Sequence, residues 1–159
     1  MHTVLAEHVP TESRGIVHGD YRPGNLSFAP DGTVVAVFDW ELSTTGDPMA
    51  DLGYLVSHWH EPGDELADGV DPGPTTVPGF GDRAAVVARY AELTGRDVSG
   101  LGYRVAFHRW RSACATAGVR ARYLAGAMAD DGHLDRIRAD AGRLPAEPAR
   151  RALADARLS

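Results

Sequence analysis

The sequence predicts an α+β fold that is mostly helical, with a short β-hairpin near its start. Two observations carry this prediction. Short β-rich runs separated by turn residues end at about residue 38, and apolar residues at helical spacing dominate from residue 49 onward. The 159 residues, of which 43% are hydrophobic and 24% charged, have the size and composition of one globular domain. We therefore expect a single domain over residues 1–159.

The hairpin is expected over residues 26–38. Leu26–Phe28 is a short run that fits a strand, and Thr33–Phe38 (TVVAVF) is rich in β-branched residues. Between them stands Pro30-Asp31-Gly32, a strong turn signal. The two runs should therefore pair as neighbouring antiparallel strands.

A first helix is expected over Met49–His60. Asp47-Pro48 is typical of a helix start, with the aspartate as N-cap and the proline at the first helical position. Apolar residues then share one face: Leu52, Leu55, Val56 and Trp59. Residues 61–80 are rich in Gly, Pro and Asp and predict a surface loop.

Helices should dominate residues 81–159. Asp82 is expected to cap a helix that ends at Thr94 before Gly95, with Arg89 and Glu92 paired on its outside. A longer helix is expected from about Leu101 to Met128, and residues 131–159 are helical in pattern with a break around 144–148. The long helix carries an apolar stripe that we expect to pack in the core: Tyr103, Phe107, Trp110, Cys114, Ala117, Ala121, Leu124 and Met128.

Charge and composition exclude several classes of function. The net charge is −6, with 16 basic and 22 acidic residues, which disfavours a nucleic-acid partner. No apolar run is long enough for a membrane helix, and Met1–Arg14 has no apolar signal core. The one cysteine, Cys114, cannot form an internal disulfide, which fits a cytoplasmic protein. Every basic residue is arginine, so the chain supplies no lysine for phosphate binding.

Polar residues suited to phosphoryl transfer gather in the first third of the chain. They are His18-Gly19-Asp20, then Asn25, then Asp39-Trp40-Glu41 after an apolar strand. An aspartate such as Asp20 can accept the proton of an attacking hydroxyl. Asn25 offers a neutral oxygen and Asp39 a charged one, which are the ligands that Mg²⁺ prefers beside nucleotide phosphates. The turn and the hairpin should bring the three side chains together.

These residues carry a resemblance to a known family. The segments IVHGDYRPGNLSF and VVAVFDWELSTTGDPMADLGYL, within residues 15–56, resemble the catalytic core of the aminoglycoside phosphotransferase-like family. They are similar in particular to the kinase-like domains fused to some acyl-CoA dehydrogenases. The resemblance implies a small-molecule kinase that uses ATP and Mg²⁺ and phosphorylates a hydroxyl. It also implies the C-terminal lobe of the protein-kinase-like fold, in which the β-hairpin carries the catalytic loop and residues 81–159 lie on the substrate side.

The resemblance assigns roles by position. Asp20 matches the catalytic aspartate, and Asn25 and Asp39 match the magnesium ligands. His18 matches a histidine that supports the catalytic loop, and Asp51 matches the helix aspartate that holds the backbone of that loop. For Arg22 two interpretations stay open: a contact with the γ-phosphate or a surface salt bridge.

The resemblance covers one lobe of a two-lobed enzyme. Only about 15 residues precede the catalytic motif, so we expect the N-terminal lobe to be absent from this chain. The alternative to a kinase is therefore a non-catalytic single lobe that acts as a binding or assembly module. Such a module would form a homodimer or pair with a separate N-terminal lobe.

Two metal-based interpretations are weaker. A metal-dependent hydrolase built on His18, Asp20 and Asp39 would need more histidine ligands nearby. His58 and His60 could suggest a metal pair, but residues two apart do not share a helix face.

Overall fold

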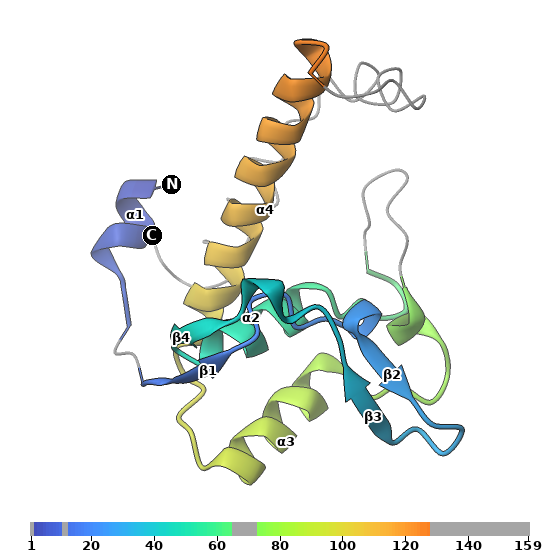
Figure 1. The fold of residues 1–159 in the computed structure, drawn as a ribbon. Coiled ribbons are helices and arrows are strands. Elements are labelled where there is room, and N and C mark those ends of the chain that lie inside the picture. The colour runs from blue at the N-terminus through green and yellow to red at the C-terminus, as the bar shows by residue number, and fades with distance from the viewer. Residues whose placement is uncertain (1, 11–12, 65–72, 128–159) are drawn as a thin grey trace. The chain divides into compact units, whose positions relative to one another are not determined.

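The computed structural model describes residues 2–10, 13–64 and 73–127. The chain divides into two compact units. One comprises Pro10–Val105, and the other comprises Met1–Val9 together with Ala106–Ser159. Figure 1 shows mixed helices and small sheets, with the strands in the Pro10–Val105 unit. The α+β prediction is confirmed at this level, and no described helix is long and apolar enough to span a bilayer.

The expected hairpin is present. Strand β2 (Leu26–Phe28) pairs antiparallel with β3 (Val34–Val37), and the register shifts between Ser27 and Phe28. A second antiparallel pair, β1 (Gly15–Val17) with β4 (Thr44–Gly46), was not expected from the sequence. Three-residue strands that pair across about 30 residues leave no local pattern to read.

Helix α2 spans Met49–Ser57 and buries Met49 and Leu52. It begins where the sequence predicted but ends three residues earlier, because the His58 amide closes the last turn on the carbonyls of Leu55 and Tyr54. Pro48, not Asp47, occupies the N-cap position. The predicted N-cap, Asp47, was therefore one residue too early in the chain. The Oδ1 of Asp47 still accepts from the Met49 amide at 3.2 Å.

Helix α3 spans Arg83–Thr94 as predicted. Asp82 caps it, since its Oδ1 accepts from the Ala85 amide at 2.6 Å, and Gly95 ends it in the left-handed conformation at φ 65°. The predicted loop of residues 61–80 contains a short 3-10 helix at Pro74–Thr76, and its residues 65–72 lie outside the described part.

The other unit contains α1 (His2–Glu7), which the sequence did not predict, and most of α4 (Leu101–Leu124). The predicted core stripe of this long helix is only partly correct. Cys114 is exposed, as are Ala117, Ala121 and Leu124. Helical spacing identifies residues that share a face, but it does not show whether another element covers that face. Met128 and residues 131–159 lie outside the described residues.

Candidate active site

The loop between β1 and β2 places Asp20 beside Asn25. A 3-10 helix at Pro23–Asn25 turns the chain, and the Asn25 amide donates to the Arg22 carbonyl at 2.9 Å. The buried Asn25 side chain reaches back, so that its Nδ2 donates to both the backbone oxygen and Oδ2 of Asp20 at 2.8 Å. One turn therefore holds a carboxylate and an amide in direct contact.

The hairpin carries Asp39 to the same end as Asn25. The strand register pairs Leu26 with Val37, and the Phe38 amide donates to the Asn25 carbonyl at 2.9 Å. Asp39 follows immediately, with φ 65° and ψ 56°. It is the only non-glycine residue with positive φ among the described residues. Aspartate tolerates this conformation better than most residues, and such strain is typical of functional positions.

The donor atoms at this end of the hairpin suit a magnesium ion. Nδ2 of Asn25 is occupied by Asp20, which leaves its Oδ1 as the atom able to bind a cation. The Asp39 side chain is exposed and adds a carboxylate. Mg²⁺ characteristically uses one or two such protein oxygens and keeps several waters. The residues present therefore fit this ion.

The other metal interpretations find no support in the described residues. No group of three or more His, Cys, Asp or Glu residues there is arranged to hold a metal ion. Nδ1 of His58 is engaged with the Tyr54 carbonyl at 3.0 Å and the Ser57 hydroxyl at 3.1 Å. Among the described residues, His18, Asp20 and Asp39 form no such group.

His18 is buried at the base of the loop, with 2% of its surface exposed. Its Nε2 lies 2.8 Å from the Phe38 carbonyl, which only accepts, so this nitrogen carries the hydrogen. Its Nδ1 accepts from the Asp20 amide at 3.2 Å. The imidazole thus connects the loop of residues 18–25 to the strand end before Asp39. The Trp40 ring packs on it at 4.6 Å between centroids.

Asp51 of α2 binds the backbone of the same loop. Its Oδ2 accepts from the His18 amide at 2.7 Å, and its Oδ1 accepts from the Gly19 amide at 2.9 Å. Gly19 has φ 85°, and a Cβ there would lie 2.7 Å from the Leu42 carbonyl oxygen. The loop conformation thus depends on a glycine at this position and on one carboxylate from the helix.

Arg22 lies against Asp20, with Nε 3.5 Å from Oδ2, and its side chain is 42% exposed. Burial acts to raise the pKa of Asp20, but hydrogen bonds from Tyr54 and Asn25 and the charge of Arg22 outweigh it, so the pKa lies below its usual value. Asp20 is therefore held as a carboxylate. Sequence reasoning missed Tyr54, although its spacing of three from Asp51 could have marked it.

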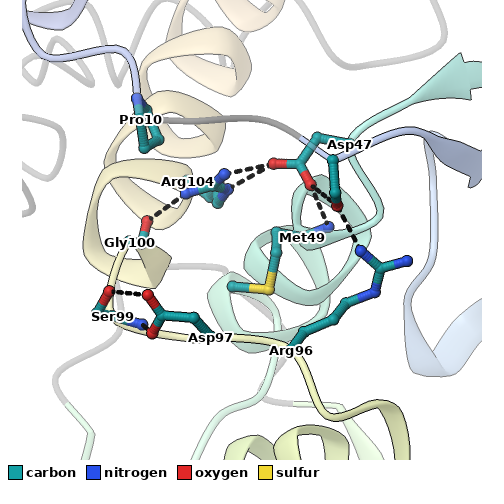
Figure 2. Close-up of a pocket in the computed structure, with 9 residues that line it drawn as sticks. Pro10, Asp47, Met49, Arg96, Asp97, Ser99, Gly100 and Arg104 are labelled. Carbon is teal, nitrogen blue, oxygen red and sulfur yellow. Dashed lines mark hydrogen bonds and ion pairs between the residues drawn. The ribbon is translucent and has the colours of Figure 1, made fainter.

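A separate pocket of about 490 Å³ lies elsewhere in the Pro10–Val105 unit. None of the predicted site residues lines it. Figure 2 shows Arg104 pointing at Asp47. Arg96 donates to the hydroxyl of Ser13. Arg104 was not singled out from the sequence. The pocket is lined by Pro10, Ser13, Asp47, Met49, Arg96, Asp97, Ser99, Gly100 and Arg104.

Comparisons with known proteins point to one family. A sequence model of the phosphotransferase enzyme family matches residues 1–93. The structure of a proposed aminoglycoside phosphotransferase from Ralstonia eutropha superposes with a TM-score of 0.74 and 34% identity, over 94% of this chain and 46% of that one.

Two curated relatives are acyl-CoA dehydrogenases by name. Acyl-CoA dehydrogenase family member 11 of Gallus gallus is 33% identical over 138 residues, which is 81% of this chain and 18% of that protein. Family member 10 of Mus musculus is 48% identical over 60 residues, or 36% of this chain and 6% of that protein. The chain thus spans less than half of the solved relative and less than a fifth of these curated relatives.

Proposed function

The chain belongs to the phosphotransferase enzyme family, and from this premise we propose that it is the catalytic half of a small-molecule kinase. In this reaction a substrate hydroxyl attacks the γ-phosphorus of ATP, the bond to the β–γ bridging oxygen breaks, and ADP and a phosphate ester are formed. The described residues would correspond to the C-terminal lobe of a protein-kinase-like fold. Because the reaction consumes ATP, we place it in the cytoplasm.

The single observation that carries this proposal is the contact between Asp20 and Asn25. Asp20 receives the proton of the substrate hydroxyl, and the Asn25 amide fixes the carboxylate through Oδ2 at 2.8 Å. Arg22, next to the same oxygen, is placed to contact the transferred phosphoryl group. Asn25 and Asp39 would hold Mg²⁺, which neutralises charge on the phosphates when bound.

The first test concerns the base. Asp20→Ala should abolish phosphoryl transfer to any accepted hydroxyl and leave the circular dichroism spectrum and the thermal midpoint nearly unchanged. The assay is run on the chain together with any polypeptide that supplies the rest of the fold. Turnover in the variant close to that of the wild type would contradict the assignment of Asp20.

The second test concerns the metal. Calorimetric titration with ATP should show binding that depends on Mg²⁺ and that Asp39→Asn removes. Asp31→Asn is the matched control, because it makes the same change at the turn of the same hairpin, at the opposite end from Asp39. Equal binding by both variants would contradict the role of Asp39.

A second candidate function is a non-catalytic binding or assembly module, and exposed apolar side chains favour it. Four of them are between 49% and 61% exposed: Val35, Phe38, Trp40 and Leu42. They lie on β3, at its end, and in the 3-10 helix Trp40–Leu42 that follows. Scattered apolar residues are normal on surfaces, whereas a cluster typically marks an interface. The proposed partner is a separately encoded N-terminal lobe, with a second copy of this chain as the alternative.

Light scattering after size-exclusion chromatography distinguishes these possibilities. A homodimer would double the mass at high protein concentration, and Phe38→Ser should restore the monomer. A chain that stays monomeric would contradict the homodimer, and binding of ATP with Mg²⁺ by that monomer would favour the kinase.

A further inference from the structure

The pocket of about 490 Å³ beside Asp47 and Arg104 has no part in the proposed transfer reaction, since no residue assigned to that reaction lines it. All of its lining residues belong to the Pro10–Val105 unit. Its volume falls within the range of about 300–1,000 Å³ that is typical of sites for small ligands. Its wall combines apolar side chains, Met49 and Pro10, with charged ones. The pocket therefore suits a small ligand that has a charged end and an apolar end.

Three of the four charged side chains on this wall are already engaged by the protein. Arg104 binds the buried Asp47 carboxylate, so these two charges compensate each other. Asp97 accepts through Oδ1 from the Ser99 amide at 2.9 Å and through Oδ2 from the Ser99 hydroxyl at 2.8 Å. Figure 2 shows Asp97 and Arg96 pointing to opposite sides of the pocket. The Asp97 carboxylate is thus turned away from the guanidinium of Arg96.

Arg96 is the fourth charged side chain, and it is available to a ligand. Within the described part of the chain it forms no ion pair, and its side chain makes one hydrogen bond, from Nη1 to the Ser13 hydroxyl. A guanidinium has five N–H groups in a planar fork that matches a carboxylate or a phosphate. Arg96 is half-buried, so an anion bound to it would be screened less than one on an exposed arginine.

The backbone places Arg96 at this wall. Gly95 ends α3 in the left-handed conformation, so the chain turns and Arg96 leaves the helix axis. The Arg96 amide then donates to the Thr94 hydroxyl at 3.3 Å. The guanidinium reaches the start of β1, where a Cβ at Gly15 would lie 4.0 Å from Nη2. Because the side chain is already held between two segments, a ligand would bind it with a smaller loss of side-chain entropy.

We propose that this pocket is a binding site for a small organic anion, whose carboxylate or phosphate group binds Arg96 and whose apolar part contacts Met49. The inference does not rest on the proposed function. The ligand would touch both segments that lead to the loop of residues 18–25, since Ser13 lies two residues before β1 and Asp47 two residues before α2.

Calorimetric titration of the full chain with two pairs of anions tests the site at constant ionic strength. The pairs are acetate with butyrate and inorganic phosphate with butyl phosphate, so each pair shares a charged group and differs in its apolar part. We expect the longer member of at least one pair to bind saturably and about tenfold or more tighter than its shorter partner, because added methylene groups are buried at the apolar wall. The pair that binds identifies the charged group.

Arg96→Met should weaken this binding about tenfold or more, which is the size of losing a hydrogen bond between charged groups. Arg96→Lys keeps the charge without the planar fork, and its affinity should lie between those of Arg96→Met and the wild type. Arg89→Met is the matched control, because Arg89 lies on α3, pairs with Glu92 and does not line the pocket. Circular dichroism shows whether each variant is folded.

Two results would overturn the proposal. One is the absence of saturable binding for all four anions. The other is binding that the Arg96 variants leave as strong as Arg89→Met does, because the anion would then be held elsewhere. Binding that is lost in Arg96→Met and retained in Arg89→Met establishes the site, whether or not the chain transfers a phosphoryl group.

Discussion

Asp47 and Arg104 form an ion pair in which each side chain is more than nine-tenths buried. Arg104 donates through Nε to Oδ2 of Asp47 at 2.9 Å and through Nη2 to the same oxygen, while its Nη1 donates to the Gly100 carbonyl at 2.9 Å. The pair joins the segment before α2 to the first turn of α4. It therefore fixes the start of the helix that carries Asp51 and Tyr54.

Removing one partner of this pair should be costly. Arg104→Met leaves the Asp47 carboxylate buried without its counter-charge, and we expect it to lower the free energy of unfolding by about 3–5 kcal/mol. Urea denaturation followed by circular dichroism measures this change. Adding Asp47→Asn to the variant should recover part of the loss, because no unpaired charge then stays buried.

Arg89→Met is the control for this experiment. Arg89 and Glu92 also form an ion pair, at 2.7 Å, but their side chains are 62% and 69% exposed. Exposed pairs contribute about 0–1 kcal/mol, so this variant should unfold almost like the wild type. Similar losses in Arg89→Met and Arg104→Met would show that burial does not determine the strength of the Asp47–Arg104 pair.

Asp47 also shows what sequence reasoning could not reach. The pattern Asp-Pro before an apolar run identified a helix start nearby, since capping depends on residues within one turn. Its main partner, however, lies 57 residues away. Local patterns found the ends of the elements but not the side chains that join them.

Two glycines allow the loop conformation to be tested against a matched position. Gly19 and Gly32 have nearly equal φ, 85° and 84°. A Cβ at Gly19 would lie 2.7 Å from the Leu42 carbonyl oxygen, whereas a Cβ at Gly32 would have no heavy atom within 4 Å. Both alanine variants should lose about 1–2 kcal/mol of stability from the left-handed backbone. Gly19→Ala should lose clearly more, and its ATP binding should weaken.

Differential scanning calorimetry compares the two variants directly. The difference between Gly32→Ala and Gly19→Ala isolates the steric contact with Leu42, because the backbone conformation is shared. Equal midpoints would mean that the loop moves away from Leu42 without cost, and the fixed geometry assigned to residues 18–20 would then be wrong.

The hairpin could be predicted from the sequence and the pairing of β1 with β4 could not, because the two pairs differ in the sequence distance between their strands. Residues 26–38 contain two β-rich runs around Pro30-Asp31-Gly32, so both the strands and their turn could be predicted from one short window. Strands β1 and β4 pair across an intervening hairpin, and Thr44–Gly46 has no alternating pattern. Cys114 illustrates the opposite error, because a regular stripe predicted burial where the helix face is exposed.

Asp51→Asn should loosen the loop of residues 18–25 while preserving the size of the side chain. The amides of His18 and Gly19 both donate to the carboxylate, and an asparagine has only one acceptor oxygen to offer them. We expect a loss of about 1–3 kcal/mol and faster hydrogen exchange at one of the two amides. Asp82→Asn is the control, because asparagine caps a helix as well as aspartate does. Unchanged exchange at both amides would contradict the role of Asp51.

The free energy of unfolding should depend on pH because Arg83, at the start of α3, pairs with the carboxylates of Glu61 and Asp64. The Arg83 side chain donates to Glu61 at 2.7 Å and to Asp64 at 2.8 Å, and its backbone amide donates to Glu61 at 2.6 Å. These bonds hold the pKa of Glu61 below its ordinary 4.5. The backbone amide of Glu61 lowers the pKa of Asp64 below its ordinary 3.8. Burial acts to raise this pKa, and Arg83 helps to lower it.

A carboxyl group whose pKa is lower in the folded state binds more protons when unfolded, so stability rises with pH in this range. The contribution of Glu61 and Asp64 should be complete above about pH 5 and be lost as the pH falls below their unfolded values. Arg83→Met should flatten this dependence between about pH 5 and pH 3, whereas Arg89→Met on the same helix should leave it unchanged. Urea midpoints at four pH values decide the question.

Parallel curves for Arg83→Met and the wild type would show that the guanidinium does not bind these carboxylates in solution. The segment before α3 would then have to be held by its other contacts, such as the hydrogen bond from the Trp59 indole to the Gly81 carbonyl at 2.9 Å.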